Sequence, residues 1–233
     1  MAQSEELKPS PSKVADIVLG NVTDYCDKEY EYEHECSGTP FDCFVYYNPD
    51  RFYEFIDLYY FKPSLSEEEL KAIGNLETFW DEVKKEYEKL WKETVIRNIA
   101  RFLNKDLYDL YKTLVWNDLH LSDISLIAKR LKAYEELLNG FKDAIRRALK
   151  DRKPLTELEL RDWYKKMAEA VYGYKNYNYN YYKYFKEVVY DLNFYDMLDD
   201  NGKLEVLNKL LNNNIDKILN EIKQTLSEYN QRL

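Results

Sequence analysis

The stretch LETFWDEVKKEYEKLWKETVIRNIARF, residues 76–102, decides the fold class of this chain. Its apolar residues recur three or four positions apart over about eight turns, which is the spacing of one buried helix face. At a rise of 1.5 Å per residue, such a helix is roughly 40 Å long. The residues that share this face are Leu76, Phe79, Trp80, Val83, Tyr87, Leu90, Trp91, Val95, Ile99 and Phe102. The stretch therefore predicts a long amphipathic helix.

Further helices are predicted on the C-terminal side of this stretch. A shorter one ends near Val115, a second long one covers residues 122–149, and others cover 157–172, 181–198 and 204–226. Thr156 and Glu159 form a capping box at the start of one of them, as Ser66 and Glu69 do upstream. Gly and Pro number only six each, too few for the many tight turns of an all-β protein. We expect an all-α, multi-helix bundle with two or three long amphipathic helices.

The first 47 residues form a different region in this interpretation. Ser10 and Pro11 open a short helix that Gly20 ends, and residues 21–47 are densely acidic. Residues 41–47 are a β-prone run, so we expect a small irregular or β-hairpin region here. The predicted domains are residues 1–47 and a helical bundle of residues 48–233, with a subdomain boundary near Pro154.

The charge balance sets the classes of partner that we expect. The 233 residues carry a formal net charge of −9, the opposite of the balance usual in proteins that hold nucleic acid through its phosphates. We therefore favour a protein partner or self-association over nucleic acid. No apolar run approaches the ~20 residues of a membrane span, and residues 1–9 lack the apolar run of a secretory signal.

A cluster of thiols and one imidazole lies in the acidic region. Cys26, His34, Cys36 and Cys43 are ligand types that can hold zinc, but their spacing is irregular and lacks a Cys-x-x-Cys pair. Two of the cysteines can instead form a disulfide, or all three can be small buried hydrophobes. The sequence leaves these three readings open.

We find no catalytic motif in the chain. It has no glycine-rich phosphate loop, no Gly-x-Ser-x-Gly elbow and no His-Glu-x-x-His pair, and it contains only two histidines. Acidic pairs occur throughout, so no single pair stands out as an acid–base couple. We therefore expect a protein that is not an enzyme and that uses no cofactor.

Tyrosine is unusually abundant, with 23 residues, and it is concentrated in the tract of residues 172–184. Alternating rings and amides could stack on bases, anchor a partner protein, pair with a sheet edge or pack back on the bundle. The abundance of Tyr, Asn and Lys can also follow from an AT-rich genome. The candidate interaction residues are Tyr172, Tyr174, Tyr177, Tyr179, Tyr181, Tyr182 and Tyr184.

Positive charge is concentrated on the two long predicted helices. It includes Arg97 and Arg101 on the first helix, and Lys129, Arg130, Arg146 and Arg147 on the second. Such residues either converge into a basic face or form a solvated surface of i,i+4 ion pairs. The basic face and the tyrosine tract together support an alternative function, association with nucleic acid. An acidic inhibitor that mimics nucleic acid is a further alternative.

In composition the chain resembles proteins from viruses of hyperthermophilic, acidophilic archaea. The resemblance lies in runs rich in Tyr, Asn and Lys, such as residues 176–183 and 212–214, and in the scarcity of Gln. It covers no functional motif and transfers no site residue. It implies a virion component or a host-interaction factor, located in the virion or the host cytoplasm. We therefore expect a protein-interaction or assembly protein.

Overall fold

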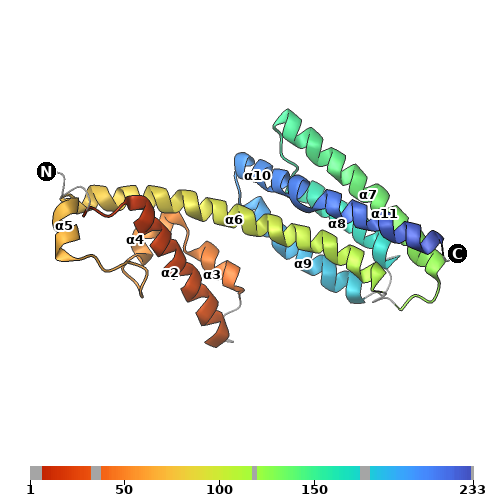
Figure 1. Ribbon diagram of the computed structural model, residues 1–233, viewed down its shortest axis with the longest axis horizontal. Coiled ribbons are helices and arrows are strands. Elements are labelled where there is room, and N and C mark those ends of the chain that lie inside the picture. The colour runs from red at the N-terminus through yellow and green to blue at the C-terminus, as the bar shows by residue number, and fades with distance from the viewer. Residues whose placement is uncertain (1–6, 33–37, 117–119, 174–178, 232–233) are drawn as a thin grey trace. The chain divides into compact units, whose positions relative to one another are not determined.

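The computed structural model describes residues 7–32, 38–116, 120–173 and 179–231 (Figure 1). Every regular element in these ranges is a helix, so the all-α fold class is confirmed. The chain divides into two compact units, Met1–Val95 and Ile96–Leu233, which we call unit 1 and unit 2. The expected domain end at residue 47 and the boundary near Pro154 stay predictions.

The longest helix is α6, Leu76–Val115, with 40 residues. The predicted helix over residues 76–102 and the shorter one after it are a single helix, because no Gly or Pro separates them. Leu103, Leu107 and Leu114 continue the buried face. The expectation of two or three long helices is not confirmed, since α6 is the one long helix in the described ranges and α7, Ile124–Asp151, has 28 residues.

The N-terminal hairpin is not confirmed. Helix α2, Pro11–Tyr32, continues through Gly20, because Val14, Val18, Val22 and Cys26 form one buried stripe four residues apart. That packing outweighs the roughly 1 kcal/mol that an interior glycine costs a helix.

The β-prone run is helical as well, and it forms α3, Pro40–Tyr46. A capping box between Thr39 and Asp42 and a proline in the first turn favour helix at this point. Phe41 and Phe44, three residues apart, are the buried residues of the helix. The local start signals and this spacing override the β propensity of the individual residues.

The rest of unit 1 surrounds a cluster of aromatic rings. The short helices η1 (Pro49–Arg51), α4 (Phe52–Phe55) and α5 (Glu67–Ile73) precede α6. Phe55 lies 5.7 Å from Phe52, 5.7 Å from Phe61 and 5.3 Å from Tyr47 between ring centroids. Each such pair adds about 0.5–1.5 kcal/mol beyond its buried area. Ring packing is therefore a main source of stability in unit 1.

Unit 2 is built from residues 96–115 of α6 and the helices that follow. These are α7, α8 (Glu157–Tyr172), α9 (Tyr179–Asp196), α10 (Asp200–Leu210) and α11 (Asp216–Asn230). Helix α7 packs against both α8 and α11, and α8 packs against α9 (Figure 1). The capping box of Thr156 and Glu159 begins α8, as the sequence predicts.

Three buried tyrosines fasten unit 2 to the main chain of α6, and we call them the tyrosine clamps. The hydroxyl of Tyr134 on α7 donates to the carbonyl of Leu107 at 2.6 Å. Tyr164 on α8 donates to the carbonyl of Leu103 at 2.8 Å, and Tyr184 on α9 donates to that of Asp106 at 2.9 Å. Each of three successive helices thus contributes one hydroxyl to the same two turns of α6.

Candidate functional site

The structure divides the predicted tyrosine tract between core and surface. Tyr181 and Tyr184 are buried in unit 2, whereas 78% of Tyr179 and 58% of Tyr182 are exposed. Tyr172, at the end of α8, is half-buried with its ring 5.9 Å from that of Tyr184. Tyr174 and Tyr177 lie outside the described residues. Two of the seven candidates therefore serve the core, and their role as interaction residues stays a prediction.

The cysteine cluster contains a disulfide between Cys26 on α2 and Cys43 on α3, with their Cα atoms 5.5 Å apart. Both thiols of this pair are consumed, so a zinc site that uses all three cysteines does not form in this state. His34 and Cys36 lie outside the described residues. The part of the chain that the structure describes holds no group of three or more His, Cys, Asp or Glu side chains able to bind a metal.

Unit 2 contains a strongly charged concave surface, which we call the basic cleft. Its cavity has a volume of about 710 Å³ and lies beside α6, α10 and α11. Six cationic side chains and a single carboxylate line it. The full lining is Arg97, Ala100, Arg101, Asn104, Lys105, Tyr108, Asp109, Lys112, Lys209, Asn214, Lys217 and Ile218.

The first wall of this basic cleft is one side of α6. Arg97, Arg101 and Lys105 follow one another at intervals of four residues, so they lie above one another on the helix. Lys112 extends the series by two further turns, which places the outer cations about 22 Å apart along the axis. The wall is an elongated strip of positive charge.

The second wall is formed by a π-helical turn, η2, Leu211–Ile215, which joins α10 to α11. In an unbroken α-helix, Lys209 and Asn214 would be about 140° apart around the axis. A π turn takes in one extra residue, which reduces this angle to about 40°. The turn therefore brings Lys209, Asn214 and Lys217 onto the side of the helix that lines the basic cleft.

Charge pairing leaves a surplus of positive charge in the basic cleft. Asp109 accepts a hydrogen bond from the Nζ of Lys105 at 2.6 Å and lies 3.9 Å from the Nζ of Lys112. The hydrogen bond to Asp109 raises the pKa of Lys105, so this lysine stays charged. Within the described ranges, Arg101 and Lys209 form no ion pair with a carboxylate. These two cations are available to an anionic ligand.

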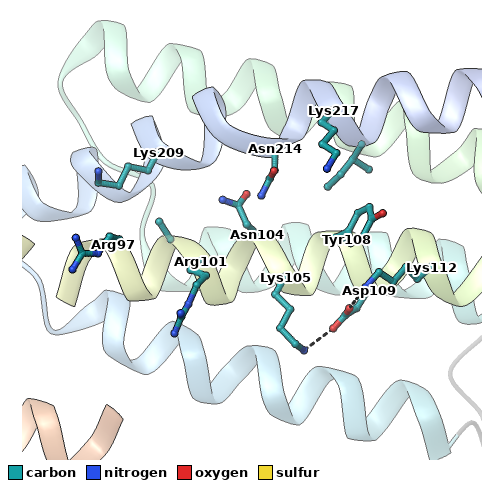
Figure 2. Close-up of a pocket in the computed structure, with 12 residues that line it drawn as sticks. Arg97, Arg101, Asn104, Lys105, Tyr108, Asp109, Lys112, Lys209, Asn214 and Lys217 are labelled. Atoms are coloured by element: carbon teal, nitrogen blue, oxygen red, sulfur yellow. Dashed lines mark hydrogen bonds and ion pairs between the residues drawn. The ribbon is translucent and has the colours of Figure 1, made fainter. Parts of the chain in front are cut away.

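Uncharged polar groups and one ring occupy the middle of the basic cleft. Figure 2 shows the amides of Asn104 and Asn214 pointing toward one another between α6 and η2, while Arg101 and Lys105 extend from another side of α6. The Tyr108 ring lies beside them, with the Nζ of Lys112 at 4.6 Å and that of Lys217 at 6.0 Å from its centroid. The basic cleft thus offers cations, amides and an aromatic ring together.

One buried and one half-buried carboxyl group, Asp106 and Asp191, lie behind this wall of α6. Only 3% of Asp106 is exposed, and the charge of the nearby Asp191 carboxyl group on α9 acts on it. Burial, followed by the charge of Asp191, raises the pKa of Asp106 well above the usual range of an aspartate. Asp106 therefore holds a proton at neutral pH.

Sequence reasoning missed the second wall, although a signal for it exists. On the last helix the apolar face runs Leu207, Leu210, Ile215, Ile218 and Ile222, with a gap of five where α-helical spacing gives three or four. Leu211 conceals this gap in the sequence, because it can be counted on the same apolar face. A gap of five inside an otherwise regular helix indicates a π turn.

The net charge of the whole chain also obscured the basic cleft. Unit 1 contains 22 acidic and 10 basic residues, a net −12, whereas unit 2 contains 21 acidic and 24 basic residues, a net +3. The chain-wide −9 therefore describes neither unit.

No protein-family model matches the chain, and neither a curated protein nor a solved structure shows significant similarity to it. In the described part of the chain, no helix combines the length and the apolar character that crossing a membrane requires.

Proposed function

We propose that unit 2 binds a single-stranded nucleic acid in the basic cleft, without catalysing a reaction. The observation that carries this proposal is the ratio of six cations to one carboxylate along a single cavity. A strip about 22 Å long can contact several phosphates in succession, which favours an extended polyanion over a single phosphate group. The Tyr108 ring and the amides at its middle suit a strand whose bases are unpaired.

The first test measures the fluorescence anisotropy of a labelled oligonucleotide at increasing salt. If the basic cleft neutralises four phosphates, raising the salt from 50 to 200 mM weakens binding by about 50-fold. Absence of binding at low salt would overturn the proposal.

Two double charge-reversal variants test whether the oligonucleotide binds in the basic cleft. Arg101→Glu with Lys209→Glu removes the two cations that lack a carboxylate partner, so we expect the affinity to fall by at least about tenfold and the salt dependence to become weaker. Arg147→Glu with Lys150→Glu is the matched control, since it makes the same charge change on the exposed surface of α7. Equal losses in the two variants would show that the basic cleft is not the site.

Protein contact through unit 1 is a second function that we propose. Between α4 and α5 the chain exposes Leu58, Tyr59 and Tyr60, with 91% of Tyr60 accessible. Exposed aromatic rings on a unit of net charge −12 fit a partner protein with a basic, apolar face. Tyr60→Ser should weaken such an association and leave oligonucleotide binding unchanged.

Light scattering over a range of concentrations tests self-association, and recovery of the protein in purified virus particles tests an assembly role. A strictly monomeric protein would count against self-association, and its absence from virus particles would count against an assembly role.

A further inference from the structure

The middle of the basic cleft carries an unsatisfied polar group. Only 5% of Asn104 is exposed, and its Oδ1 is buried without a hydrogen-bond partner within the described residues. An unpaired buried acceptor of this kind costs about 1–3 kcal/mol. Folding alone therefore gives no reason for an amide at position 104.

A ligand gives such a reason. Asn104 faces Asn214 across the cavity, and Lys209 and Lys217 lie to either side of Asn214 on the second wall (Figure 2). An amide has both a donor and an acceptor, and a half-turn about its last side-chain bond exchanges the two. A phosphate oxygen needs only donors, which Arg101, Lys209 and Lys217 already supply. The amides instead match a neutral group that has a donor and an acceptor side by side.

The edge of a nucleobase has this arrangement, and asparagine pairs with such an edge through two hydrogen bonds. We infer that Asn104 and Asn214 contact a nucleobase, while the surrounding cations hold the phosphates of the same strand. This inference rests on the proposed binding of a nucleic-acid strand and specifies which part of the strand each residue contacts.

The test compares two labelled strands with the same number of phosphates, one with bases and one abasic. For the wild-type chain we expect the strand with bases to bind about tenfold more tightly, since a good amide–base pair contributes about 1–3 kcal/mol. Asn104→Leu and Asn214→Ala should each weaken binding of the base-containing strand several-fold and leave the affinity for the abasic strand unchanged. Arg101→Glu should lower the affinity for both strands by the same factor.

Two controls keep this test decisive. Asn208→Ala removes an exposed amide on α10 that does not line the basic cleft, so it should keep the full preference for bases. Asn104→Leu removes an unpaired buried acceptor and should fold at least as stably as the wild type. If it does not fold, Asn214→Ala carries the test, because this side chain is half-buried at the cavity.

The outcomes separate the inference from the proposed function. Equal affinity for the two strands, or a preference for bases that survives in both amide variants, overturns the nucleobase contact and leaves strand binding intact. Failure of both strands to bind at low salt overturns the proposed function itself. Loss of the preference in either amide variant, with abasic binding retained, supports the inference.

Discussion

The two units differ in charge and in the way they use aromatic residues. Unit 1 carries a net −12 and buries rings against rings, as Phe52, Phe55 and Phe61 do. Unit 2 carries a net +3 and uses the tyrosine clamps, whose hydroxyls bond to the carbonyls of α6. Composition averaged over a chain can therefore conceal two units of opposite net charge.

Each unit also has its own cross-link or buried polar group. Cys26 and Cys43 join α2 to α3 in unit 1, and all three cysteines of the chain lie in that unit. Unit 2 has no cysteine and instead buries the Asp106 carboxyl group of α6, which interacts with the half-buried Asp191 of α9. Reductant, pH and single hydroxyl deletions should therefore act on the two units differently.

Loss of the disulfide should have the largest effect and should be confined to unit 1. The two cysteines are 17 residues apart, and closing a loop of this size stabilises the folded state by about 3 kcal/mol. The double variant Cys26→Ser with Cys43→Ser should lower the free energy of opening of unit 1, measured by hydrogen exchange, by this amount. The protection of unit 2 should not change.

Cys36→Ser, with the disulfide intact, is the control for this prediction. Reductant should destabilise unit 1 of the control variant, because it breaks the disulfide. It should not change the stability of the double variant, which has no disulfide. Insensitivity of the wild-type chain to reductant would contradict a structural role of the bond.

Removal of the buried carboxyl group should have the next largest effect, and it should stabilise unit 2. The folded state keeps the proton on Asp106, whereas an unfolded chain releases it above a pKa of about 3.9. The stability that this proton confers is therefore full below about pH 3.9 and is lost as the pH rises toward the raised pKa of the folded state.

Asp106→Asn cannot lose this proton. We expect the variant to gain on the order of 2 kcal/mol of unfolding free energy at pH 8, with a smaller gain at pH 5. Urea denaturation at the two pH values measures this difference. Asp143→Asn changes an exposed residue of α7 and is the control. Its unfolding free energy should stay within about 0.5 kcal/mol of the wild-type value at both pH values. A variant with the same pH dependence as the wild type would show that Asp106 is ionised in the fold.

Removal of one clamp hydroxyl should have the smallest effect. Tyr164→Phe keeps the ring and deletes only the bond to the Leu103 carbonyl, so we expect a loss of about 1 kcal/mol. Tyr182→Phe, at an exposed position on α9, is the control and should be neutral. Thermal denaturation distinguishes the two, and equal melting temperatures would show that the hydroxyl contributes nothing.

The sequence predicted the helical class and several helix starts, because these depend on local spacing and capping. Ser66 and Thr156 cap their helices as expected. It failed at Gly20 and at residues 41–47, where the burial of Val22, Cys26 and Phe44 outweighs local preference.

The candidate site was less predictable than the fold. The cations of α6 are visible in the sequence, but their meeting with Lys209 and Lys217 depends on a π turn and on contacts between distant helices. The disulfide was one of three open readings, since sequence cannot show which cysteines approach one another. The tyrosine tract contributed Tyr181 and Tyr184 to the core, which periodicity alone did not indicate.

The tyrosine clamps also bear on how this fold can diverge in evolution. Each clamp hydroxyl bonds to a main-chain oxygen, which every amino acid provides. The residues at positions 103, 106 and 107 can therefore change as far as packing allows, while the three tyrosines keep their partners. Distant relatives of this chain should be recognisable by tyrosines on three successive helices rather than by the sequence of the long helix that they hold.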